Sequence, residues 1–158
     1  MRRFKSAANI YKGVNQVILK PVGVIRSPYK TKDEAPNQGR KNENTSKVEV
    51  YQEFHSCLKD IETATHLIVL YWADQADRTV QQTSTPYDDK PHGVFATRSP
   101  SRPNPINFSV VDLISREGNI LTVQGLDALD GSMLIDLKPY SPGIDSVPDA
   151  KLGWMEGK

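Results

Sequence analysis

One proline-dense segment holds several polar side chains that could bind a ligand. Residues 93–106 contain three prolines and two arginines. Because proline fixes φ and lacks an N–H group, this segment should stay outside the interior of a sheet and hold its polar groups with little freedom. Arg98 and Arg102 could each bind a carboxylate or phosphate through two hydrogen bonds, and Asn104 could contact a base edge. An equally good interpretation is a rigid structural loop whose arginines donate to neighbouring carbonyls.

A second segment, residues 125–140, combines carboxylates with a Lys-Pro-Tyr sequence. The side chains concerned are Asp127, Asp130, Asp136, Lys138 and Tyr140. Carboxylates can bind ribose hydroxyls or an amino group, and a Pro-Tyr pair offers a flat surface on which a base can stack. Because Asp-Gly is a common turn pair, a β-turn is sufficient to explain Asp130 alone.

The common cofactor and catalytic signatures are absent from the sequence. It contains no G-x-G-x-x-G, G-x-x-x-x-G-K-[ST] or G-x-S-x-G motif, which argues against a dinucleotide fingerprint, a P-loop and a hydrolase elbow. His55, His66 and His92 are too scattered for a local metal motif, and Cys57 is the only cysteine. We therefore expect neither a metal site nor an internal disulfide.

Length and composition predict one domain with a real core. The chain has 158 residues, of which 37% are hydrophobic and 25% charged. We expect an N-terminal arm over residues 1–15 and a single domain over 16–158. No run approaches the ~18 apolar residues of a membrane span, and no apolar run follows the start to form a signal peptide. The expected location is the cytoplasm.

Charge is distributed unevenly along the chain. Residues 1–50 carry 11 Lys or Arg against 4 Asp or Glu, whereas residues 51–158 carry 9 against 15. A basic N-terminal third could face a polyanion. The alternative is a solvated basic arm, because Lys and Arg are ordinary surface residues.

Hydrophobic periodicity predicts strands with a single helix. The polar stretches 27–47 and 74–92 are expected to be loops, and Arg116–Asn119 has hairpin turn chemistry. The expected strands are 16–25 (bent at Pro21), His66–Trp72 (buried on both faces), Phe108–Ser115, Asn119–Leu126 and Met133–Leu137, and the expected amphipathic helix is Val48–Thr63. Strands and helices do not alternate, so the predicted fold class is mainly β and not a Rossmann fold.

Together, residues 93–106 and 126–140 closely resemble the TsaA-like or TrmO family. Members of this family are S-adenosylmethionine-dependent methyltransferases that act on N6 of a modified adenosine beside the tRNA anticodon. Further matching segments keep the family's order: Val22–Tyr29, Pro36–Gln38, His66–Trp72 and Asp145–Asp149. The resemblance covers roughly residues 20–156.

The resemblance implies a small, mostly antiparallel β-barrel with one or two helices, working as a homodimer that binds S-adenosylmethionine near the subunit interface. The implied substrate is tRNA, with a threonylcarbamoyl-modified adenosine as acceptor. The implied cofactor residues are Pro36, Asn37, Gln38, Asp74, Gln75, Arg98, Phe108, Leu126, Asp127, Ala128 and Leu129. Arg98 would pair with the methionyl carboxylate, Phe108 would pack on adenine, and Asp127 would bond the ribose or the adenine amine.

Roles in methyl transfer can also be suggested for residues outside this set. The exocyclic amine of adenine is a poor nucleophile, so a hydrogen-bond acceptor near its N–H groups is needed, and we assign that role to Asp136. Tyr140 would stack the target base, and Lys138 or Arg102 would hold a phosphate. The basic residues expected to contact the tRNA backbone are Arg26, Lys30, Lys32, Arg40 and Lys41.

One position departs from the family pattern. Asn107 stands where many relatives have a glycine, so a backbone conformation that only glycine permits would be altered there.

Two other functions stay open. The first alternative function is a non-catalytic dimeric module that binds S-adenosylmethionine or a nucleoside. The second is methyl transfer to a different acceptor.

Overall fold

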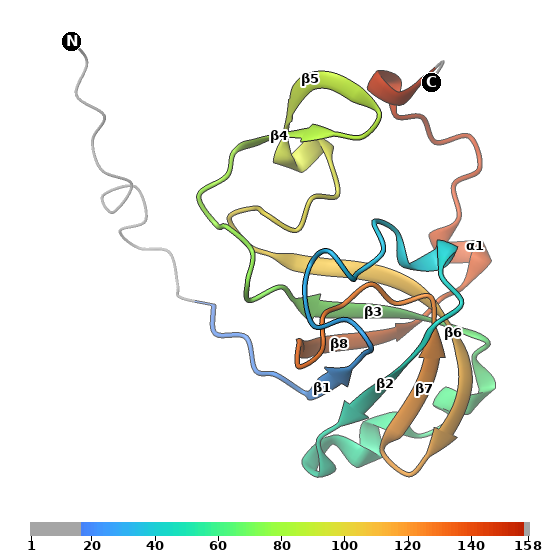
Figure 1. The fold of residues 1–158 in the computed structure, drawn as a ribbon. Helices are drawn as coiled ribbons and strands as arrows, with labels where there is room; N and C mark the ends of the chain where they lie inside the picture. Colours follow the sequence, from blue (N-terminus) through green and yellow to red (C-terminus); the bar gives the residue numbers. More distant parts are fainter. Residues whose placement is uncertain (1–16, 157–158) are drawn as a thin grey trace.

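Six antiparallel strands close into a barrel in the order β1, β2, β7, β6, β3, β8 (Figure 1). The structure is a computed structural model that describes residues 17–156, so the expected arm over 1–15 lies outside the described residues. The strands are β1 (Gly23–Arg26), β2 (Thr45–Val50), β3 (His66–Trp72), β6 (Ile106–Glu117), β7 (Ile120–Gln124) and β8 (Met133–Pro139). The expected mainly β fold class is confirmed.

The barrel interior is filled by alternate residues of each strand. In β3, Leu67, Val69 and Tyr71 are buried in one cluster with inward residues of the other strands, including Val111 and Leu121. Because side chains of a strand alternate between faces, the intervening residues of β3 point out of the barrel. One face of the sheet therefore makes the core and the other is available to a ligand or partner.

Two expectations about strands are confirmed. Strand β3 has the bounds predicted from its continuous apolar run. Strands β6 and β7 form the predicted hairpin, and Gly118 in its two-residue turn has a φ of +62°. This left-handed conformation suits glycine because it has no Cβ.

The predicted helix over Val48–Thr63 is wrong. Residues 48–50 complete strand β2, and the rest forms two short 3₁₀ helices, η3 (Gln52–Leu58) and η4 (Ile61–Thr63). The apolar residues do recur at helical spacing, but Asp60 adopts a φ of +65° and interrupts the run. The expected strand over 16–25 is also shorter, because regular pairing begins only at Gly23, after Pro21.

A two-stranded hairpin stands outside the barrel, where the sequence predicts only a polar loop (Figure 1). It consists of β4 (Gln82–Thr85) and β5 (Asp88–Gly93) and is followed by the 3₁₀ helix η5 (Val94–Ala96). The C-terminal segment, which includes α1 (Pro142–Asp145) and η6 (Gly153–Met155), returns to this hairpin. Trp154 stacks on His92 and donates to the Ala96 carbonyl at 3.1 Å.

Candidate ligand-binding site

Two loops that the sequence singles out meet at one end of the barrel. Gly39, in the 3₁₀ helix η2 (Gly39–Lys41), packs directly on the segment after β7. A Cβ atom at Gly39 would lie 2.2 Å from the Gly125 carbonyl oxygen and 3.0 Å from the Asp127 amide nitrogen. The absence of a side chain at Gly39 therefore lets residues 36–38 lie beside residues 125–129.

Asp127 is anchored from inside the barrel. Its Oδ1 accepts a hydrogen bond of 2.9 Å from the Tyr71 hydroxyl and one of 2.7 Å from the Ser109 hydroxyl. No described residue donates to its Oδ2 in the structure. Burial, and then the nearby Asp127 charge, raise the pKa of Tyr71, so this hydroxyl remains a donor.

Arg98 and Phe108 form a second element of the site. The Arg98 Nη2 donates to the Phe108 carbonyl at 2.7 Å, and its guanidinium carbon lies 5.2 Å from the centre of the Phe108 ring. The Phe108 side chain is 41% exposed, which is high for this residue type. Phe108 precedes Ser109 in β6, but neighbouring residues of a strand point to opposite faces, so the exposed ring lies on the outer face while Ser109 contacts Asp127 from the inner face.

Contacts from the outer hairpin reach the first loop. Gln38 Nε2 donates to the Tyr87 hydroxyl at 3.1 Å. Hydrogen bonds from Thr79, and more weakly the Lys32 charge, lower the pKa of Asp77. These contacts place the segment after β3 close to the loop that precedes η2.

The remaining residues of the implied cofactor set differ in exposure. Pro36 is half-buried, Asn37 is exposed, and Asp74 and Gln75 are exposed in the loop that follows β3. Leu126 and Ala128 belong to the hydrophobic core, Leu129 is half-buried, and the Ala128 carbonyl accepts a hydrogen bond from Ser27. Only backbone groups of Leu126 and Ala128 are therefore suited to contact a ligand.

Asp136 shares one row of the sheet with Phe108. Leu70 of β3 pairs with Phe108 on one side and with Asp136 on the other. Because directly paired residues point to the same face, Phe108 and Asp136 both face outward, with Cα atoms about 10 Å apart. The Asp136 carboxylate is 3.0 Å from Lys138 Nζ.

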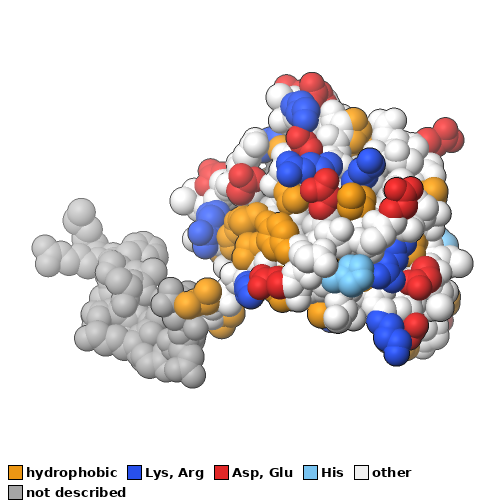
Figure 2. Space-filling model, turned by 90° about the horizontal axis from the view of Figure 1, so that it is seen from below, with side chains coloured by type: hydrophobic (Ala, Val, Ile, Leu, Met, Phe, Trp, Pro, Cys, Tyr) orange, Lys and Arg blue, Asp and Glu red, His pale blue; other side chains and the backbone are white. Residues whose placement is uncertain are grey.

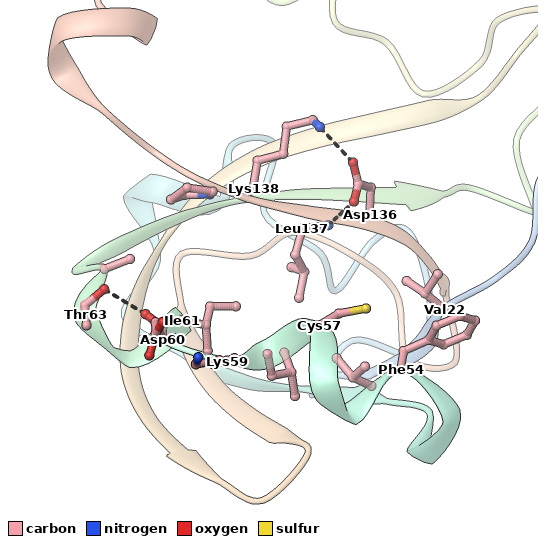
Figure 3. Close-up of a pocket in the computed structure, with 14 residues that line it drawn as sticks. Val22, Phe54, Cys57, Lys59, Asp60, Ile61, Thr63, Asp136, Leu137 and Lys138 are labelled. Atoms are coloured by element: carbon pink, nitrogen blue, oxygen red, sulfur yellow. Dashed lines mark hydrogen bonds and ion pairs between the residues drawn. The ribbon is translucent and has the colours of Figure 1, made fainter.

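An apolar cavity lies under β8, and Asp136, Leu137 and Lys138 are among the residues that line it (Figure 3). It has a volume of about 330 Å³ and lies between β8 and the helices η3 and η4. In Figure 3, Leu137 points into the cavity, whereas the Asp136 and Lys138 side chains point away from it toward each other. The proposed acceptor carboxylate therefore faces the outer surface of the barrel.

Tyr140 lies farther from the site. Its amide donates to the His66 carbonyl at 3.0 Å, at the opposite end of β3 from Tyr71. Leu70 lies four residue steps along the strand from His66, which corresponds to about 13 Å. The structure thus does not bring Tyr140 together with Phe108 and Asp127.

Arg102 has the arrangement of a structural brace. Its guanidinium donates to the carbonyls of Ser99, Val94 and Thr97 at 2.7, 3.0 and 2.6 Å. The alternative interpretation of this loop, in which an arginine bonds neighbouring carbonyls, therefore describes Arg102. Asn104 is exposed at the end of the same loop.

The basic residues expected to contact tRNA are partly engaged within the protein. Arg26 pairs with Glu49 at 3.4 Å, Lys30 pairs with Asp130, and Arg40 donates to the Val110 carbonyl. Lys32 and Lys41 are exposed. In Figure 2, basic and acidic side chains lie next to each other on the face shown.

Sequence reasoning missed Tyr71 and Ser109 as residues of the site, and it missed the contact that Asn107 makes. Asn107 Nδ2 donates to the Tyr71 hydroxyl at 3.2 Å. Asp60 is the only described non-glycine residue with a positive φ, so Asn107 does not adopt the left-handed conformation that favours glycine. The available signal was a tyrosine in a buried apolar strand, because a buried hydroxyl needs a partner.

Two kinds of site are absent from the part of the chain that the structure describes. No three His, Cys, Asp or Glu side chains in it gather closely enough to hold a metal ion. None of its helices has the length and apolar character needed to cross a membrane.

The fold defines a small antiparallel β-barrel protein with the candidate ligand-binding loops at one end. The sequence profile described as tRNA-methyltransferase O N-terminal domain matches residues 24–146. The chain therefore belongs to the TrmO family, as the resemblance of its two motif segments indicates.

Individual relatives agree with this assignment. A protein of Archaeoglobus fulgidus named "Probable S-adenosyl-L-methionine-binding protein" is 59% identical over 140 residues, which is 89% of this chain and 38% of the relative. The tRNA (adenine(37)-N6)-methyltransferase of Escherichia coli is 34% identical, over 85% of this chain and 62% of the enzyme. A crystal structure of TrmO superposes with a TM-score of 0.76 and 34% identity, covering 88% of this chain and 64% of that one. The chain thus spans less than two thirds of each of these three proteins.

Proposed function

We propose that the protein is an S-adenosylmethionine-dependent methyltransferase that acts on N6 of the adenosine next to the tRNA anticodon, in the cytoplasm. The observation that carries the proposal is that β6 links the family's two motif segments: the Phe108 carbonyl accepts a hydrogen bond from Arg98, and the adjacent Ser109 hydroxyl donates to Asp127. The expected acceptor is the threonylcarbamoyl-modified adenosine.

The chemistry of this site fits S-adenosylmethionine. The exposed Arg98 guanidinium suits a carboxylate, the free Asp127 Oδ2 suits a hydroxyl or amine donor, and the Phe108 ring suits a purine. Because Arg98 already lies over the Phe108 ring, the purine would use the remaining part of that ring. When bound, the cofactor supplies an electrophilic methyl group on a sulfonium.

The acceptor side of the proposal rests on the outer row of the barrel. Asp136 would accept a hydrogen bond from the adenine amine and stabilise the positive charge that develops on it. Lys138 lies beside Asp136 and is 60% exposed, so it remains able to contact a phosphate. Tyr140 would contact the target base only if the base extends along β8 toward His66.

A homodimer is part of the proposal. Ile106, Trp72 and Met133 are paired across β6, β3 and β8, so they share the outward face with Phe108. Ile106 and Met133 are 38% and 36% exposed, which gives an apolar surface beside the cofactor residues. Such a surface supports a subunit contact next to the site.

Incorporation of a labelled methyl group tests the proposed activity. Purified protein and labelled S-adenosylmethionine would be incubated with tRNA, with free adenosine or with no acceptor. We expect label in tRNA alone, with binding that weakens as salt is raised. Label in free adenosine, or transfer that is insensitive to salt, would instead support a different acceptor.

A binding module without catalysis is the second candidate. The relative of highest identity quoted above is named only for S-adenosylmethionine binding. Calorimetric binding of the cofactor without transfer to any tRNA would favour this candidate. Light scattering on the same sample tests the dimer, which should have twice the 17.6 kDa mass of the chain.

A further inference from the structure

A chain of hydrogen bonds inside the barrel ends on the Asp127 carboxylate. Asn107 donates to the Tyr71 hydroxyl at 3.2 Å, and Tyr71 donates to Asp127 Oδ1 at 2.9 Å. Asn107 and Tyr71 are direct partners in the register of β6 and β3, so their side chains leave the sheet on the same face. That face is the barrel interior, because Tyr71 is only 3% exposed.

A second hydroxyl reaches the same carboxylate oxygen. Ser109, two residues after Asn107 in β6, donates to Asp127 Oδ1 at 2.7 Å and is 7% exposed. Two buried hydroxyls on neighbouring strands therefore converge on Oδ1. Within residues 17–156, Oδ2 receives no hydrogen bond, so one oxygen is fixed by the barrel while the other is left for a donor from outside.

The Tyr71 hydroxyl is more than a packing group. Phenylalanine would fill the same space in the core without requiring a partner for a buried oxygen. Hydrogen bonds to a charged carboxylate are stronger than those between neutral groups, and two of them restrict its rotation. The energetic cost of burying this hydroxyl is thus offset by the anchoring of Asp127.

We infer that Tyr71 is a positioning residue which, together with Ser109 and Asn107, fixes the Asp127 carboxylate so that Oδ2 accepts a hydrogen bond from a hydroxyl or amine of the bound nucleoside. This inference rests on the proposed function, in which Asp127 contacts S-adenosylmethionine. It also gives Asn107 a role in this chain, because a glycine at that position has no side-chain amide to donate to the Tyr71 hydroxyl.

The first test compares two tyrosine-to-phenylalanine variants by calorimetry with S-adenosylmethionine. Tyr71→Phe removes the donor to Asp127 and keeps the ring. Tyr29→Phe is the matched control, because Tyr29 is also 3% exposed but its hydroxyl contacts Asn44. We expect the Kd to rise about tenfold for Tyr71→Phe and to stay within about twofold for Tyr29→Phe. Thermal unfolding of both variants ensures that folded proteins are compared.

A double-mutant cycle tests whether Tyr71 acts through Asp127. In the Asp127→Asn background, Tyr71→Phe should weaken binding by no more than about twofold, because the carboxylate it positions is gone. In the methyl-transfer assay, Tyr71→Phe should raise the KM for S-adenosylmethionine while kcat stays within about twofold. A merely structural role would lower the thermal midpoint without this selective change in KM.

The possible results separate this inference from the proposed function. If the unaltered protein binds no S-adenosylmethionine, both are overturned. If the unaltered protein binds and Tyr71→Phe binds equally well, only the positioning role is overturned. If the fold-changes in Kd caused by Tyr71→Phe and by Asp127→Asn simply multiply in the double variant, the positioning role is also overturned.

Discussion

Gly39 and Gly125 make a backbone contact that leaves no space for a side chain on Gly39. A Cβ atom there would lie 2.2 Å from the Gly125 carbonyl oxygen and 2.8 Å from its carbonyl carbon. Both obstructing atoms belong to the backbone, which cannot rotate aside as a side chain can. The contact therefore sets how closely the loop at residues 36–38 lies to Asp127.

Substituting Gly39 with alanine should separate these two loops. We expect Gly39→Ala to lower the free energy of unfolding by about 1–3 kcal/mol and to weaken S-adenosylmethionine binding by at least about tenfold. Chemical denaturation and calorimetry measure the two effects. Gly143→Ala is the control, because nothing lies within 4 Å of its Cβ position. Full binding by Gly39→Ala would show that this contact does not organise the site.

The barrel could be predicted only where its sequence carries a strong local signal. The run His66–Trp72 is almost entirely apolar, so strand β3 was predicted with its bounds. Gly118 lies between two alternating segments, which made the β6–β7 hairpin predictable. The hairpin β4–β5 has polar, exposed strands that pack little apolar surface, so hydrophobic periodicity gave no signal for it.

For the site, the sequence identified which segments matter but not how they meet. Arginines and carboxylates in the two motif segments stood out because their charges are costly to bury and useful for ligands. Tyr71 did not, because within an apolar strand it has the pattern of a core residue. The anchoring of Asp127 depends on the pairing of Tyr71 with Asn107 across two strands, which is a property of the barrel.

Arg102→Lys should distinguish a brace from a phosphate contact. Lysine keeps the charge but cannot reach three carbonyls in the geometry of a guanidinium. We expect the free energy of unfolding to fall by about 2 kcal/mol and the salt dependence of tRNA binding to stay unchanged. Lys41→Ala provides the comparison, since an exposed phosphate contact should reduce the slope of log K against log salt by about 1. A reduced slope for Arg102→Lys with unchanged stability would favour the phosphate role.

Acid should destabilise the protein partly through Asp130. The hydrogen bond that Lys30 donates has the largest effect and lowers the pKa of Asp130 in the folded protein. The hydrogen bond from the Ser27 amide lowers this pKa further. The ionised carboxylate therefore stabilises the fold above about pH 4, and this contribution is lost as the pH falls through the lowered value. Urea unfolding between pH 7 and pH 2 should show a smaller loss of stability for Asp130→Asn than for the unaltered protein. Asp33→Asn, at an exposed position after β1, should keep the original profile, and identical profiles for all three proteins would contradict the prediction.

Asp136→Asn should reduce methyl transfer without affecting cofactor binding. The amide has the shape of the carboxylate but lacks the charge that stabilises a developing cation, so we expect kcat to fall about a hundredfold. The Kd for S-adenosylmethionine should stay within about twofold. Loss of the exposed ion pair with Lys138 should have little effect on stability. Asp112→Asn, on strand β6 at the far side of β3, is the control, and normal turnover by Asp136→Asn would exclude its proposed role.

The most direct test of the proposed activity is the position of the transferred methyl group. Purified protein would be incubated with labelled S-adenosylmethionine and tRNA from a strain that lacks this activity, and the digested nucleosides would be analysed by mass spectrometry. We predict a methyl group on N6 of the adenosine next to the anticodon. The absence of label from tRNA, with cofactor binding still measured by calorimetry, would contradict methyl transfer to tRNA and favour a binding module or another acceptor.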